Sequence, residues 1–142
     1  MKPTIRFYNE DIRFVLPQKA NYRSWIATVA QQFGKKVGEL TFIFCSDDYL
    51  LSINKQFLAH DYFTDIITFD YGTEDTIAGD IYISIDRVQD NASKFLVDKN
   101  LELQRVVIHG VLHLCGLKDK SENDQKNMRK AEEDALLLFD KK

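Results

Sequence analysis

The sequence predicts an α+β fold, a small mixed β-sheet of about four strands covered by helices, with the helix that carries two histidines in the C-terminal half. Two observations lead to this prediction. In the first half of the 142-residue chain, strand-like segments alternate with segments of helical spacing. Two further strand-like segments then lie close together, and the rest of the chain reads as helix.

The individual elements follow from residue type and spacing. Strands are predicted at four segments rich in β-branched and aromatic residues: residues 4–9, 39–45, 65–72 and 78–85. Helices are predicted at residues 19–34, 47–58, 86–99 and 101–116, with a last one beginning near Ser121. Gly34 is suited to a helix C-terminus, Ser46 to an N-cap, and the short polar stretch between the last two strands to a hairpin turn. The last helix has a capping-box pattern at Ser121 and Asp124 and is interpreted as a packing helix.

Composition predicts one domain over residues 1–142, because glycine and proline do not cluster into a linker. No apolar run reaches the roughly 18 residues that span a bilayer, so no membrane partner is expected. The N-terminus lacks the apolar stretch of a signal peptide, which predicts a cytoplasmic protein. Cys45 and Cys115 form no CxxC pair, so neither a disulfide framework nor a disulfide-linked partner is expected. The net charge of −3 is unfavourable for nucleic acid unless a local basic surface or a metal cation compensates.

The stretch HGVLHLCGLKD, residues 109–119, contains two of the three histidines in the chain. His109 and His113 are four residues apart, so on a helix both imidazoles lie on one face and can bind one metal ion. Gly116 can end the helix and reverse the chain, which brings the carboxylate of Asp119 back toward them. Three protein ligands leave a fourth position for water, the arrangement of a catalytic zinc site. The pattern therefore predicts one Zn²⁺ per chain, bound by His109, His113 and Asp119.

Other interpretations of this stretch are open from the sequence alone. The two histidines can also be partly buried residues that are satisfied by hydrogen bonds. Cys115 would face away from His113 on a helix, which favours a small core residue over a metal ligand. Gly110 replaces the glutamate that serves as general base in H-E-x-x-H zinc proteases. A glycine here allows the close approach of a neighbouring strand or of a bulky substrate.

The same stretch resembles the H-G-x-L-H-L-x-G-x-D-H motif of the YbeY family of bacterial endoribonucleases, also called rRNA maturation factors. TDIITFDYG, GDIYIS and ELQRVVIHG are similar to family segments in the same order, so the resemblance runs from about Glu39 to the end of the chain. It implies an α+β fold, a zinc ion held by the motif's histidines, and metal-dependent cleavage of single-stranded RNA. It also implies 3′-end maturation of small-subunit rRNA and ribosome quality control, with single-stranded rRNA and the small ribosomal subunit as partners.

Two positions depart from the family pattern. The third histidine of the motif falls on Asp119 and the aspartate before it on Lys118, and Glu132 resembles a family position at the same offset. A carboxylate ligand makes the site more anionic, which should weaken zinc as a Lewis acid. The family arginine associated with the RNA phosphate falls on Leu58, which cannot neutralise a phosphate. The sequence does not identify the catalytic acid and base, and His60 and Lys118 are the candidates for supplying the missing positive charge.

Three functions are compatible with these observations. The first is a zinc-dependent, single-strand-specific endoribonuclease that acts in ribosome biogenesis. The second is another metal-dependent hydrolase, with a peptide or small ester as substrate, against which the missing glutamate counts. The third is a non-enzymatic ribosome-assembly factor with a structural metal, which the replaced arginine and the negative net charge favour. The motif as a whole favours the first.

Overall fold

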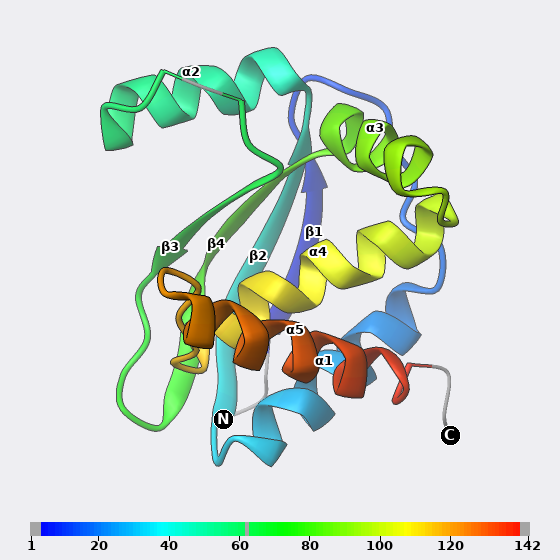
Figure 1. Ribbon diagram of the computed structural model, residues 1–142. Helices are drawn as coiled ribbons and strands as arrows, with labels where there is room; N and C mark the ends of the chain where they lie inside the picture. Colours follow the sequence, from blue (N-terminus) through cyan, green and yellow to red (C-terminus); the bar gives the residue numbers. More distant parts are fainter. Residues whose placement is uncertain (1–3, 62, 140–142) are drawn as a thin grey trace.

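The computed structural model describes residues 4–61 and 63–139, which form a four-stranded sheet and five helices (Figure 1). In chain order the elements are β1 (Thr4–Asn9), α1 (Lys19–Gln32), β2 (Lys36–Cys45), α2 (Asp47–Leu58), β3 (Ile66–Asp70), β4 (Thr76–Ser84), α3 (Ile85–Phe95), α4 (Lys99–Leu114) and α5 (Glu122–Leu136). The predicted α+β fold is confirmed, because each predicted strand and helix is present with ends that differ by a few residues. Among the described residues, no helix combines the length and apolarity needed to cross a membrane.

The sheet has the strand order β1-β2-β4-β3. Strands β1 and β4 both pair with β2 in parallel, whereas β3 pairs with β4 in antiparallel. The connections between the parallel strands contain helices and the antiparallel pair is a hairpin, as these two kinds of pairing require. The predicted mixed sheet and the predicted hairpin are therefore confirmed.

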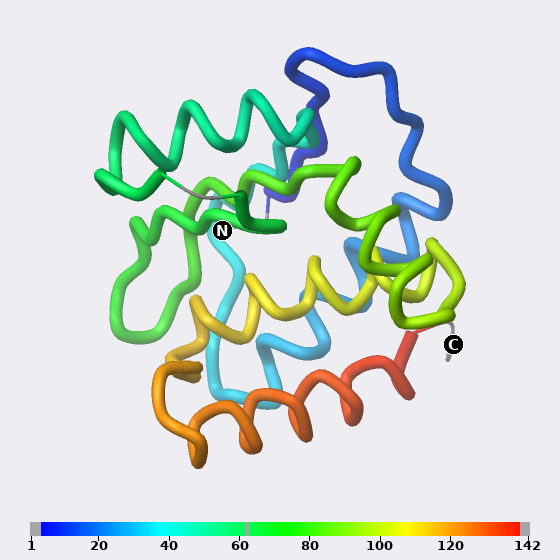
Figure 2. Tube along the Cα trace, turned by 45° about the horizontal axis from the view of Figure 1, so that its top comes forward, coloured from blue at the N-terminus to red at the C-terminus, as the bar shows by residue number. Residues whose placement is uncertain are grey.

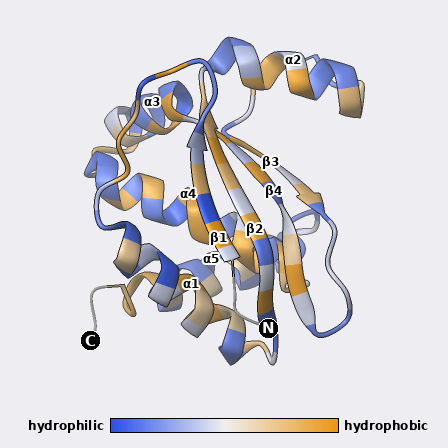
Figure 3. Cartoon of the chain, turned by 180° about the vertical axis from the view of Figure 1, so that it is seen from behind, coloured by the Kyte–Doolittle hydropathy of each residue, from blue (hydrophilic) through white to orange (hydrophobic). Residues whose placement is uncertain are grey.

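Helices cover both faces of the β3–β4 part of the sheet. Successive residues of a strand point to opposite faces, and in β3 the side chain of Ile66 packs against the main core whereas Ile67 belongs to a second cluster. That second cluster includes Leu50 and Ile53 of α2. The main core contains buried side chains of α1 and α4. Figure 3 views the molecule from behind, and in that view the sheet lies in front of α4 and α5. Helix α4 therefore lies between the sheet and α5.

Helix α5 packs on the outer side of α4 and runs beside it in two views (Figures 1 and 2). The side chains of Met128 and Ala135 are buried, and the indole N–H of Trp25 in α1 donates a 2.7 Å hydrogen bond to the carbonyl of Ala135. At the start of α5, the Ser121 hydroxyl accepts the Asp124 N–H and the Asp124 side chain accepts the Ser121 N–H. The predicted capping box and packing helix are both confirmed.

At Gly110, α4 approaches the sheet closely. A Cβ atom at this position would lie 2.9 Å from Cδ1 of Ile66 in β3 and 3.2 Å from Cδ1 of Ile81 in β4. Ile81 is fully buried and has little room to move. The glycine thus permits the approach of a neighbouring strand, which was one of the two explanations that the sequence left open.

Replacing Gly110 by valine is expected to lower the free energy of unfolding by about 2 kcal/mol, because the added methyl groups overpack the contact with Ile66 and Ile81. Thermal or urea unfolding of the metal-free protein measures this effect. The matched control is Gln104→Val, a position of the same helix that is not buried, where a change within about 0.5 kcal/mol is expected. Equal stability of the two variants would show that α4 does not pack closely on the sheet at Gly110.

Candidate functional site

The C-terminus of α4 is closed by the glycine turn that the sequence predicts. Gly116 has a φ angle of +109°. The N–H of Gly116 donates to the carbonyl of His113 at 3.0 Å, and the N–H of Leu117 donates to the carbonyl of Leu112 at 3.1 Å. These two bonds form a Schellman motif, in which the chain leaves the helix and turns back along it. The reversal brings Asp119 to α4, as predicted.

His109 lies at the centre of the resulting site. Its Nε2 atom is 3.3 Å from Oδ2 of Asp119, and its Nδ1 atom is 2.6 Å from Oε2 of Glu132 in α5. The Glu132 side chain is 6% exposed, whereas the Asp119 side chain is 44% exposed. The imidazole therefore bridges a buried carboxylate on one side and a solvent-accessible carboxylate on the other.

Arg105 joins Glu132 to a second buried carboxylate, Glu102. The guanidinium of Arg105 donates to both carboxylate oxygens of Glu102, at 3.0 and 2.6 Å, and to Oε1 of Glu132 at 3.3 Å. These contacts raise the pKa of Arg105, chiefly through the hydrogen bond to Glu102. Burying a carboxylate costs folding free energy unless the carboxylate is paired. The contacts with Arg105 therefore stabilise Glu102 and Glu132 in their buried positions.

The electrostatic environment favours a positive charge at His109. Burial opposes that charge, but the hydrogen bond to Glu132 and the charges of Glu132, Asp119 and Asp65 outweigh it and raise the pKa of His109. Asp65 comes just before β3, and its own pKa is raised by burial against the opposing effects of Arg105 and His109. The site thus gathers negative charge around one imidazole.

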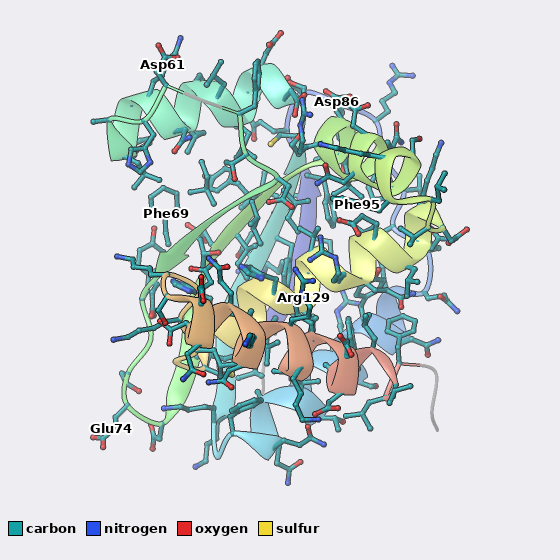
Figure 4. All side chains as sticks on the ribbon, in the orientation of Figure 1. Asp61, Phe69, Glu74, Asp86, Phe95 and Arg129 are labelled. Carbon is teal, nitrogen blue, oxygen red and sulfur yellow. The ribbon has the colours of Figure 1, made fainter. Side chains whose placement is uncertain are left out.

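A polar cleft of about 240 Å³ opens at this point. Its polar lining comes from α4, α5 and the loop between them: Arg105, His109, Asp119, Gln125, Arg129 and Glu132. Figure 4 shows Arg129 between α4 and α5, and the Gln125 amide donates to the carbonyl of Asp119 at 3.2 Å. The cleft therefore places the exposed Arg129 beside the histidine–carboxylate pair.

The other residues singled out in the sequence lie outside this cleft. His113 is exposed on the turn of α4 after His109, and in residues 4–61 and 63–139 no three His, Cys, Asp or Glu side chains converge closely enough to form a complete metal site. Lys118 is exposed in the loop, and His60 is exposed after α2. Cys115 is buried, and burial raises the pKa of its thiol to about 11, which fits the predicted core role.

The contact of His109 with Asp119 has the length of an ion pair and also the separation of two ligands of one zinc ion. Two ligand atoms bound at about 2.0–2.2 Å to one tetrahedral zinc lie about 3.3–3.6 Å apart. The separation of 3.3 Å between Nε2 of His109 and Oδ2 of Asp119 agrees with this value. His113 is one helical turn away, at a Cβ distance of about 5–6 Å from His109 for this spacing, and its side chain is exposed.

The sequence predicts no role at the site for the residues that α5 contributes, although Glu132 resembles a family position. Glu132 and Arg129 lie in the predicted packing helix, and their roles depend on how α5 lies against α4. One signal was present in the sequence: Glu132 lies between Met128 and Ala135 on the buried stripe of the helix. A carboxylate in an apolar stripe indicates a buried partner.

The fold and the cleft define a class of protein. A histidine and carboxylates that meet from two helices and a loop of an α+β fold are the groups that hydrolases use to bind a metal ion or to move a proton. The chain belongs to the Endoribonuclease YbeY family, whose model matches residues 5–140. The match includes β1 and α1, so it reaches further toward the N-terminus than the resemblance seen from Glu39 onward.

Individual relatives agree with this assignment. Endoribonuclease YbeY of Christiangramia forsetii is 49% identical over 138 residues, which cover 97% of this chain and 96% of that protein. Endoribonuclease YbeY of Cytophaga hutchinsonii is 50% identical over 139 residues, with coverage of 97% and 96%. The solution structure of a Thermotoga maritima protein matches with a TM-score of 0.67 and 29% identity, covering 94% of this chain and 87% of that one. The chain is therefore a member of a family of enzymes with an α+β fold.

Proposed function

We propose that residues 1–142 form a single zinc-dependent endoribonuclease domain that cleaves single-stranded RNA. Its place of action is the cytoplasm, where it matures the 3′ end of small-subunit rRNA in contact with the small ribosomal subunit. The observation that carries the proposal is the His109–Asp119 pair, whose 3.3 Å separation matches two ligands of one zinc ion. Family membership supplies the reaction class.

His109, His113 and Asp119 are the residues that would hold the metal. A bound zinc ion would supply Lewis-acid polarisation of a phosphate oxygen or a hydroxide for attack on phosphorus. The carboxylate of Asp119 adds negative charge to the ligand set, which favours binding of the cation and weakens its Lewis acidity. A slow enzyme is therefore expected.

Arg129 is the residue best placed to contact the RNA phosphate. Arg105 lines the same cleft, but its guanidinium is bound to two buried glutamates. Leu58, at the position of the family arginine, ends α2 and is not part of the cleft. Arg129 is exposed in the cleft beside His109 and carries the planar guanidinium that binds phosphate well.

The cleft favours a single strand over a duplex. Bases and phosphates of single-stranded RNA can rearrange to enter a cleft of about 240 Å³, whereas an A-form duplex presents a rigid backbone. The net charge of −3 gives little general attraction for RNA, so binding depends on local contacts such as Arg129. Metal-loaded protein is therefore expected to cut a single-stranded oligonucleotide and to spare the same sequence in a duplex. Equal cleavage of both forms, or of neither, would contradict the proposal.

Alanine in place of Arg129 is expected to reduce single-strand cleavage by about tenfold or more, because a charge-assisted hydrogen bond contributes roughly 1.5–3 kcal/mol. Zinc affinity should be unchanged, since Arg129 is not a ligand. Lys126→Ala removes a positive charge from an exposed position of the same helix outside the cleft and is the matched control. If both variants cleave equally well, Arg129 has no particular role in phosphate binding.

Asp119→His restores the ligand type that the family motif has at this position. Zinc affinity in this variant is expected to stay within about tenfold of wild type, because imidazole and carboxylate are both ordinary zinc ligands. Asp119→Ala is expected to bind zinc more than about 100-fold more weakly. The loss of a ligand should reduce zinc affinity at least as much as the loss of a residue that only orients a ligand. Competition with a chromophoric chelator measures both affinities. Wild-type affinity in Asp119→Ala would remove Asp119 from the ligand set.

A further inference from the structure

Behind the proposed metal ligands lies a row of ionic groups, two of them buried carboxylates, that the proposed function does not require by itself. Glu102 and Glu132 have side chains that are 2% and 6% exposed, and Arg105 lies between them. The row continues from Glu132 to Nδ1 of His109 at 2.6 Å. The far nitrogen of His109, Nε2, faces Asp119 and the cleft.

The row contains one negative charge more than its own cation balances. Glu102 and Glu132 contribute two carboxylates, and Arg105 contributes one guanidinium. Arg105 contacts Glu102 twice, at 3.0 and 2.6 Å, and Glu132 once, at 3.3 Å, so Glu132 is the less fully neutralised of the two carboxylates and the one that contacts His109. A buried excess charge is costly, and a cation held at Nε2 of His109 would offset it.

The hydrogen bond to Glu132 also determines which nitrogen of His109 is available. With the Glu132 carboxylate as the acceptor of this contact, Nδ1 of His109 carries the proton and donates it. In the neutral imidazole the lone pair then lies on Nε2, which faces Asp119 and the cleft. This arrangement of carboxylate, histidine and metal position is the one in which an outer carboxylate orients a histidine ligand.

We propose that Glu132 is a positioning residue of this site. It fixes the ring orientation and the Nδ1–H tautomer of His109, so that Nε2 is available for the metal, and Arg105 and Glu102 keep the Glu132 carboxylate in place. The inference rests on the proposed function for the identity of the metal. The Nδ1–H tautomer is a property of the metal-free protein and is tested independently of zinc binding.

The experiment uses the full chain and three variants. Nitrogen-15 NMR of the imidazoles in the metal-free protein, at an alkaline pH where His109 is neutral, reports which ring nitrogen carries the proton. Chelator competition reports the zinc affinity of the same samples. Glu132→Ala removes the acceptor, Glu132→Gln keeps a carbonyl acceptor without the charge, and Glu133→Ala removes an exposed carboxylate from the neighbouring position as the control.

Wild type and Glu133→Ala are expected to show His109 with the proton on Nδ1. Glu132→Gln should keep this tautomer and bind zinc about tenfold more weakly, whereas Glu132→Ala should lose the tautomer and bind about 100-fold more weakly. Protonated Nε2 in wild type, or an unchanged tautomer and zinc affinity in Glu132→Ala, would overturn the inference. A wild-type protein that binds no zinc would overturn the proposed function instead, and the tautomers of wild type and Glu132→Ala would still decide the role of Glu132.

Discussion

Alanine in place of His113 is expected to weaken zinc binding by more than about 100-fold, a larger loss than removal of an orienting group causes. The metal-free protein should keep its stability within about 0.5 kcal/mol, because the side chain is exposed. The stabilisation that zinc gives to wild type should therefore disappear, since metal binding is linked to folding. His113 is a better test than His109, whose removal would also take from the buried Glu132 one of its two partners and leave only Arg105.

Chelator competition and thermal unfolding with and without zinc measure the two effects of His113→Ala. His60→Ala is the matched control, because it removes the other exposed histidine, which lies outside the cleft. The control should bind zinc as wild type does. Wild-type affinity in His113→Ala would mean that the third ligand is another residue. A large loss of stability in the metal-free variant would mean that His113 is a packing residue.

Replacing Arg105 by methionine is expected to lower the free energy of unfolding by about 3 kcal/mol, the low end of the range for breaking a buried ion pair. The low end applies because the Arg105 side chain is 36% exposed, whereas its partner Glu102 is 2% exposed. Methionine keeps much of the aliphatic stem, so the effect reports the loss of the guanidinium from between two carboxylates. The melting temperature should fall by about 6–12 °C for a domain of this size.

Arg129→Met provides the comparison for the Arg105 variant. Both arginines line the same cleft, but Arg129 is exposed and its replacement should change stability by no more than about 0.5 kcal/mol. The two variants thus separate a structural arginine from one that is available to substrate. Equal melting temperatures for the two variants would contradict the structural role assigned to Arg105.

The features that the sequence predicted are those that depend on near neighbours in the chain. The spacing of His109 and His113, the glycine turn at Gly116 and the return of Asp119 span 11 residues and follow from helix geometry and backbone conformation. The capping box at Ser121 is local in the same way. Each of these could be argued from the residues themselves, and the turn and the approach of Asp119 to His109 were found as expected.

The features that the sequence did not predict depend on how helices pack. The contact of His109 with Glu132 joins residues 23 positions apart, and that of Arg105 with Glu132 joins residues 27 positions apart. No spacing rule relates α4 to α5 at that distance along the chain. The side-chain orientation of His113 is not predicted for another reason: residue spacing determines which face of α4 carries His113, but it does not determine the rotamer.

The most direct test of the central claim is cleavage of a single-stranded rRNA precursor fragment by one protein preparation in three states. The preparation is assayed as zinc-loaded protein, after chelation, and after zinc is restored, with His109→Ala purified in parallel to exclude a contaminating ribonuclease. A zinc-dependent endoribonuclease predicts slow cleavage that is lost on chelation, recovered with zinc and absent from His109→Ala. Cleavage that survives chelation, or that His109→Ala performs at the same rate, would contradict the account.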